Sequence, residues 1–74
     1  MFKIMVYAKG RSVHRYDFVE RFGAWQHFEM YKREVQDGFY LSCELWKRAK
    51  RDVVATGLPG EIIWELVERY NLED

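Results

Sequence analysis

The hydrophobic residues at the start of the chain alternate with other residues, as in a β-hairpin. The alternation runs over residues 2–8 and resumes over residues 13–16, with the polar turn Lys9-Gly10-Arg11-Ser12 between them. A third alternation follows over residues 39–46. Its apolar face carries Phe39, Leu41, Cys43 and Leu45. We therefore predict an N-terminal hairpin and a third strand that can lie beside it.

Between these strands the period changes from two to three or four, which is typical of an amphipathic helix. The helix is predicted over residues 18–36. Its apolar stripe comprises Phe18, Phe22, Trp25, Phe28, Tyr31 and Val35. Asp17 and Glu20 have the spacing of a capping box at its start. The pair Asp37-Gly38 is typical of a helix end.

The last third of the chain predicts a second helix. Lys47–Arg51 is interpreted as a basic connector, and residues 52–56 fit either a short fourth strand or the start of a loop. The turn residues Gly57-Leu58-Pro59-Gly60 come next. A C-terminal amphipathic helix is then predicted over residues 60–72. Its apolar residues are Ile62, Ile63, Leu66, Val67 and Tyr70.

Together these elements predict a single α+β domain over residues 1–74. Its core is a small antiparallel sheet of three to four strands in ββαβ order, with one long amphipathic helix and the C-terminal helix. One sheet face is expected to pack on the first helix through Ile4, Val6, Leu41 and Cys43. The last helix has three alternatives: it covers the other sheet face, packs beside the first helix, or docks onto a second copy of the chain.

The charge is zero overall but unevenly spread. Residues 1–51 carry eleven Lys/Arg and six Asp/Glu, whereas residues 52–74 carry one Arg and six acids. The whole molecule therefore offers no large field of one sign, which argues against a dedicated DNA-binding protein and against a DNA mimic. A single cysteine, no signal peptide and no long apolar stretch predict a cytoplasmic protein that does not associate with membranes.

The residues that usually carry catalysis form no specific motif. His14 and His27 are the only histidines, and Cys43 alternates with core positions, which predicts an inert buried thiol. The segment 57–60 lacks the spacing and the lysine of a phosphate-binding loop. We predict a protein that is not an enzyme and that binds no metal and no cofactor.

The predicted last helix offers a candidate protein-binding surface. Its acidic face carries Glu61, Glu65 and Glu68 beside Trp64, and Trp46 ends the third strand. A tryptophan among carboxylates suits a basic protein surface, because tryptophan is a frequent hot-spot residue. The alternative is that Trp64 caps the core and the acids form an ordinary solvated face.

Two further surfaces suit nucleic acid. A basic cluster that can contact phosphates comprises Lys47, Arg48, Lys50 and Arg51, with Lys9 and Arg11 from the hairpin turn. The alternative is a solvated connector. The outward sheet face is expected to carry Met5, Tyr7, Tyr40, Trp46 and Tyr16. Aromatic residues on an open sheet can stack bases, unless the last helix covers them.

Residues Met1–Trp46 form the series hairpin, aromatic-rich helix, glycine and third strand ending in Leu45-Trp46. In this order of elements the chain resembles the compact β-β-α-β proteins that bacteriophages encode, among them anti-CRISPR proteins and inhibitors of bacterial RNA polymerase. The resemblance implies a stoichiometric binding protein that blocks or redirects a larger host complex. It assigns no functional residue, and the segment from Lys47 onward departs from the shortest members.

Three functions are therefore expected, in descending order. The first is a non-enzymatic protein-binding module, a phage-type inhibitor or accessory factor that acts on a larger host protein as a monomer or homodimer. The second is a nucleic-acid-binding regulator that uses residues 47–51 and the sheet aromatics. The third is a homodimeric structural module whose last helix is its own interface.

Overall fold

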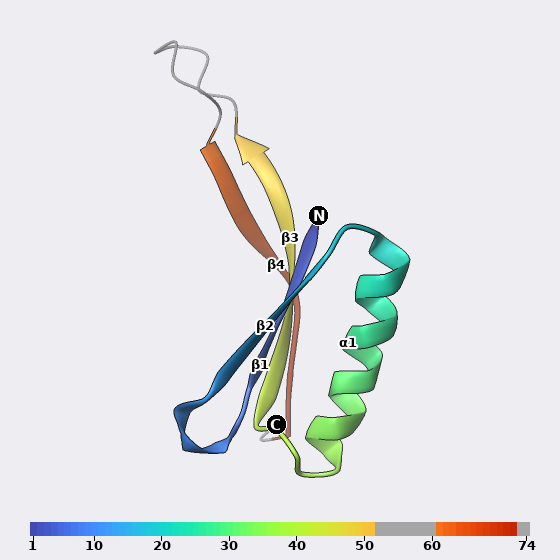
Figure 1. Cartoon of the computed structure of the whole chain (residues 1–74), viewed down its shortest axis with the longest axis vertical. Helices are drawn as coiled ribbons and strands as arrows, with labels where there is room; N and C mark the ends of the chain where they lie inside the picture. The colour runs from blue at the N-terminus through green and yellow to red at the C-terminus, as the bar shows by residue number, and fades with distance from the viewer. Residues whose placement is uncertain (52–60, 73–74) are drawn as a thin grey trace.

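The protein forms a four-stranded antiparallel sheet with one helix on one face, as seen in a computed structural model (Figure 1). The structure describes the backbone of residues 1–51 and 61–72 and the side chains of residues 1–49 and 63–72. The elements are β1 (Phe2–Tyr7), the 3-10 turn η1 (Lys9–Arg11), β2 (Val13–Phe18), α1 (Arg21–Gln36), β3 (Ser42–Arg51) and β4 (Glu61–Asn71). The strand order is β2-β1-β3-β4, with each neighbouring pair antiparallel. The predicted α+β class and the N-terminal hairpin are confirmed.

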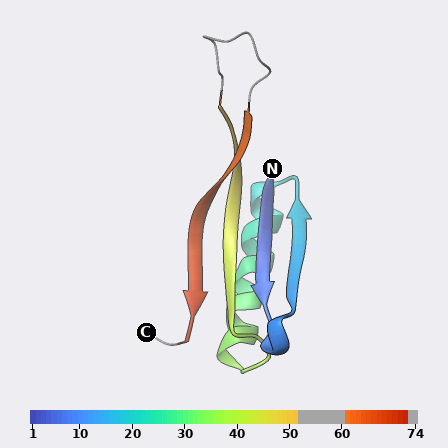
Figure 2. The same ribbon diagram turned by 90° about the vertical axis from the view of Figure 1, so that its left-hand side faces the viewer.

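The helix α1 covers one face of the sheet, and no described element covers the opposite face (Figure 2). The core between α1 and the sheet comprises Ile4, Val6, Ala24, Phe28, Tyr31, Val35, Cys43 and Leu45. The predicted contacts through Ile4, Val6 and Cys43 are therefore confirmed. Among the described residues, no helix has the length and apolarity needed to cross a membrane.

The start of α1 differs from the prediction. The helix begins at Arg21, its N-cap residue is Glu20, and the Glu20 side chain makes no capping hydrogen bond. Asp17 and Phe18 belong to β2, where the pairing with β1 continues up to Phe18. The Asp17 carboxylate pairs instead with Arg15 at 3.0 Å. The predicted capping box is wrong because strand pairing holds these residues in extended conformation.

The predicted end of α1 is confirmed. Asp37 is the C-cap residue, and Gly38 follows with a φ of +87°, which favours glycine. The Gly38 N–H donates to the Val35 carbonyl at 3.1 Å and the Phe39 N–H to the Glu34 carbonyl at 3.0 Å. These two bonds make a Schellman motif, which satisfies carbonyl groups at the helix end.

The third strand lies further along the chain than predicted. β3 begins at Ser42, so Phe39 and Leu41 precede it and are exposed rather than buried. The strand then continues through Lys47 to Arg51, because β4 pairs with it along this whole stretch. The predicted basic connector is therefore part of a strand.

The largest correction concerns the C-terminal helix predicted over residues 60–72. Glu61–Asn71 is the edge strand β4, antiparallel to β3. In this pairing Trp46 lies opposite Leu66 and Leu45 lies opposite Glu68, so Val67 is an extra residue in β4, a β-bulge. The bulge shifts the alternation of the β4 side chains between the two sheet faces by one residue, which gives the apolar residues a helix-like spacing. Residues 52–56, which fitted either a short strand or the start of a loop, lie outside the described residues.

The buried thiol of Cys43 predicts a pH-dependent stability. Burial raises the pKa of Cys43 from 9.0 to about 11. Above pH 9 the thiol of the unfolded chain ionises, whereas the thiol of the folded chain keeps its proton. The contribution of Cys43 to the free energy of unfolding is therefore fully present below pH 9 and is lost between pH 9 and 11. The loss at pH 10 is expected to be about 1 kcal/mol.

Urea unfolding of the wild type and of Cys43→Ala at about pH 8 and about pH 10 measures this loss. The variant is expected to start less stable, because it leaves a small cavity, but to lose less between the two pH values. An equal loss in both proteins would contradict the assignment to Cys43.

Candidate functional site

The sheet face opposite α1 gathers aromatic rings and cations. The strand register directs alternate residues of the four strands to this side. They include Lys3, Met5, Tyr7, Arg15, Glu44, Trp46, Arg48, Trp64, Leu66 and Arg69. The predicted C-terminal helix, for which covering this face was one of three alternatives, is not formed, and α1, the one helix of the described residues, lies on the other side (Figure 2). We call this surface the open face.

Two cations lie against the Trp64 ring. The Nζ of Lys3 is 4.4 Å from the ring centroid of Trp64 and 5.5 Å from that of Trp46. The Cζ of Arg15 is 5.5 Å from the Trp64 centroid. Lys3, Arg15 and Trp64 come from β1, β2 and β4, so their contacts join both edge strands of the sheet. Each such contact contributes about 0.5–1 kcal/mol at an exposed site.

Beside this cluster, the buried carboxylate of Glu44 forms hydrogen bonds and an ion pair with other side chains of the open face. Glu44 is 6% exposed, and its Oε1 accepts hydrogen bonds from the Tyr7 hydroxyl at 2.7 Å and from Trp46 Nε1 at 3.2 Å. Its Oε2 lies 3.4 Å from Arg69 Nε. The hydrogen bond to Glu44, together with burial and the carboxylate charge, raises the pKa of Tyr7. Glu44 therefore fixes the orientation of the Trp46 ring.

The open face carries more cations than acids. The Asp17 carboxylate pairs with Arg15 at 3.0 Å and the Glu44 carboxylate pairs with Arg69. Lys3 forms no ion pair with a described acid, and neither does Arg48, although Arg48 Nη1 lies 3.5 Å from Met1 Sδ. An anionic group that reaches this face therefore finds two cations that pair with no described carboxylate.

The structure separates the candidate protein-binding residues. Trp46 and Trp64 share the open face, whereas Glu65 and Glu68 occupy positions on the α1 side of β4. Glu68 accepts a hydrogen bond from Lys32 of α1 at 3.1 Å. The side chain of Glu61 lies outside the described residues. Among the described side chains, Trp64 thus lies against the cations Lys3 and Arg15, whereas the predicted acids Glu65 and Glu68 lie on the other side of the sheet.

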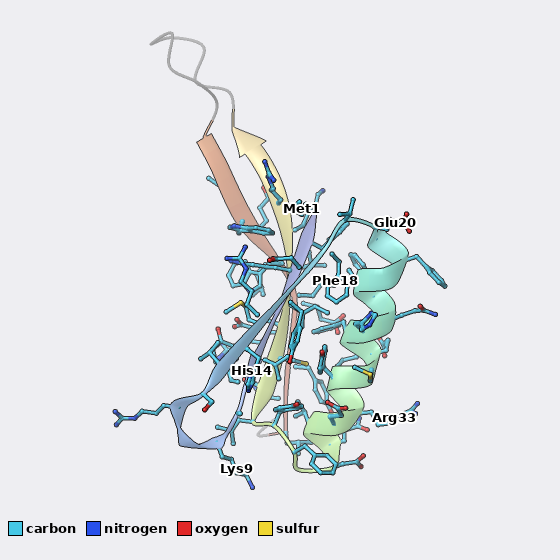
Figure 3. All side chains as sticks on the ribbon, in the orientation of Figure 1. Met1, Lys9, His14, Phe18, Glu20 and Arg33 are labelled. Carbon is cyan, nitrogen blue, oxygen red and sulfur yellow. The ribbon has the colours of Figure 1, made fainter. Side chains whose placement is uncertain are left out.

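The predicted basic cluster is also divided. Adjacent strand residues face opposite sides, so Arg48 lies on the open face and Lys47 on the α1 side. Lys9 and Arg11 lie in η1, at the end of the sheet far from Met1 (Figure 3). The side chains of the two remaining candidates, Lys50 and Arg51, lie outside the described residues.

Three of the five predicted sheet residues reach the open face: Met5, Tyr7 and Trp46. Tyr16 and Tyr40 lie instead on the α1 side, where their ring centroids are 5.3 and 6.2 Å from that of Tyr31. Sequence reasoning overlooked Lys3 and Arg15. The hairpin alternation already places Lys3 with Met5 and Tyr7, opposite the core residues, and that signal was sufficient to find it.

The histidines and acids of the described residues form no cluster suited to a metal ion. In this part of the chain, no group of three or more His, Cys, Asp or Glu side chains is arranged to hold one. His14 stacks on Tyr16, and His27 Nδ1 lies 2.8 Å from the Gly23 carbonyl oxygen. Comparison of the chain with protein-family models, with curated proteins and with solved structures finds no match.

Proposed function

We propose that this protein binds single-stranded nucleic acid on the open face of its sheet. The observation that carries the proposal is the cluster of Lys3 and Arg15 around the half-buried Trp64 ring, with Trp46 beside it. Nucleotides combine a flat base with an anionic phosphate, and this cluster combines flat rings with cations. The nucleic-acid function, second among the expectations from sequence, is thereby favoured over the first.

Each component of the cluster has a separate role in the proposed complex. The rings of Trp46 and Trp64 stack on bases, which contributes about 1–3 kcal/mol per base. Lys3 and Arg48 pair with phosphates, because neither has a described acidic partner. A single strand fits better than a duplex, since the bases of a duplex are stacked on one another and cannot reach the rings.

Fluorescence anisotropy with a labelled oligo-dT or oligo-U of about 12 nucleotides tests the proposal. Trp64→Ala is expected to weaken binding about tenfold to hundredfold, as a lost base stack implies. Lys3→Ala is expected to lower the slope of log affinity against log salt by about one unit. A duplex of the same length is expected to bind more weakly than the single strand.

Two exposed residues away from the open face serve as controls. Phe39→Ala removes an exposed ring and Lys9→Ala removes a cation of the hairpin turn. Both are expected to leave the affinity unchanged. Absence of binding at about 50 mM salt, or equal affinity of Trp64→Ala and wild type, would refute the proposal.

The phage-type protein-binding function remains a second proposal, favoured by the edge of β4. This strand has no described neighbour on its outer side, and Leu66 and Val67 are exposed. An extended segment of a partner can add to such an edge. A partner captured equally with and without nuclease, and lost with Leu66→Lys, would support this function. The third expectation was a homodimer with the C-terminal helix as its interface, and this segment forms the strand β4 instead.

A further inference from the structure

A cleft of about 400 Å³ lies on the α1 side of the sheet, away from the open face. Its lining residues are Phe2, Arg21, Trp25, Lys47 and Val67. They come from β1, α1, β3 and β4, so the cleft depends on the folded arrangement of four elements. Its volume lies at the lower end of the range for small-molecule sites, which is about 300–1,000 Å³.

The aromatic lining of the cleft is held in place by the core. The rings of Phe2 and Trp25 meet edge to face, with centroids 5.3 Å apart and an angle of 81° between their planes. Both rings are partly buried and pack against the core. They therefore provide a fixed apolar surface that suits a flat ring, because edge-to-face and offset-stacked contacts are favourable.

The rim of the cleft carries two cations. The Arg21 guanidinium carbon lies 4.9 Å from the Trp25 ring centroid, and Lys47 extends from β3. Glu20 precedes Arg21, and Glu65 lies opposite Lys47 in the strand register. Nevertheless, no described acid forms an ion pair with Arg21 or Lys47. A guanidinium stacked on a ring keeps its N–H groups available at its edge for an oxyanion.

We propose that this cleft binds a small aromatic anion, a flat ring that carries one phosphate, carboxylate or sulfonate group. The ring lies against Phe2, Trp25 and Val67, and the anionic group lies between Arg21 and Lys47. This site is independent of the proposed nucleic-acid face, because it lies on the other side of the sheet.

Titration with phenyl phosphate, followed by two-dimensional NMR, tests the inference. Saturable shifts are expected for the Trp25 indole N–H and the Val67 methyl groups. Inorganic phosphate, which lacks the ring, and benzyl alcohol, which lacks the charge, are each expected to bind at least tenfold more weakly. Equal binding of either fragment, shifts confined to Trp46 and Trp64, or no saturable shift would overturn the inference.

Three variants separate this site from the open face. Arg21→Met and Lys47→Met keep the apolar stems and remove the charges, and each is expected to weaken phenyl phosphate binding about fivefold to tenfold. Arg33→Met, on the same helix but outside the cleft, and Trp64→Ala, on the open face, are expected to leave it unchanged. Unchanged affinity in both cleft variants would overturn the role of the two cations.

Discussion

Replacing Phe28 with alanine is expected to destabilise the protein by about 3–5 kcal/mol, which is the usual cost of deleting a fully buried ring. Phe28 is 1% exposed and is the largest fully buried side chain among the described residues. A domain of this size has a stability of about 5–10 kcal/mol, so the variant loses a large part of it. Urea unfolding followed by far-UV circular dichroism measures the change, with a much lower midpoint expected.

The same helix provides a matched control in Phe22→Ala. Phe22 is 73% exposed, so its removal is expected to change stability by no more than about 0.5 kcal/mol. At 100° per residue, Phe22 lies about 120° around the helix from Phe28. Similar losses in the two variants would contradict the packing of α1 on the sheet.

The comparison of Phe22 with Phe28 shows what helical periodicity can and cannot predict. The spacing of three and four identified α1 and its buried residues Phe28, Tyr31 and Val35. It could not locate the first residue of the helix, because Asp17 and Phe18 are held by pairing with β1, a contact between separate elements. The predicted apolar stripe therefore began too early, at Phe18, and it included the exposed residue Phe22.

The prediction of a helix over residues 60–72 was wrong because the same spacing of apolar residues fits either a helix or a strand that contains a bulge. β-branched and aromatic residues such as Ile63, Trp64 and Val67 favour a strand when a partner is available. That partner, β3, is longer than predicted, and the bulge at Val67 adds the residue that makes the spacing look helical. Both features depend on tertiary pairing, so periodicity alone did not reveal them.

The same correction changed the predicted sites. On a helix, Trp64 would share a face with Glu61 and Glu68, whereas on a strand the register places it opposite Arg48. Its contacts with Lys3 and Arg15 join residues far apart in the sequence. The aromatic residues of the open face and Lys3 were partly predictable from alternation, but the contacts of Lys3 and Arg15 with Trp64 required the strand order.

Replacing Glu44 with leucine is expected to destabilise the protein by about 1–3 kcal/mol, because it leaves polar partners without an acceptor. The Tyr7 hydroxyl and the Trp46 indole N–H both donate to this carboxylate, and neither is fully exposed. Arg69 is largely exposed and can turn to water, so its lost ion pair adds little. Urea unfolding measures the stability, and near-UV circular dichroism reports the ordering of the Trp46 ring.

Glu44→Gln distinguishes the hydrogen bonds from the charge. The amide oxygen still accepts from Tyr7 or Trp46, so a smaller loss of about 1 kcal/mol is expected. Because the carboxylate contributes to the raised pKa of Tyr7, the variant should ionise this tyrosine at lower pH than the wild type. NMR titration of the Tyr7 ring measures the shift. An unchanged Tyr7 titration, with equal stability of Glu44→Leu and wild type, would mean that Glu44 does not organise the open face and that the Trp46 ring is held by packing alone.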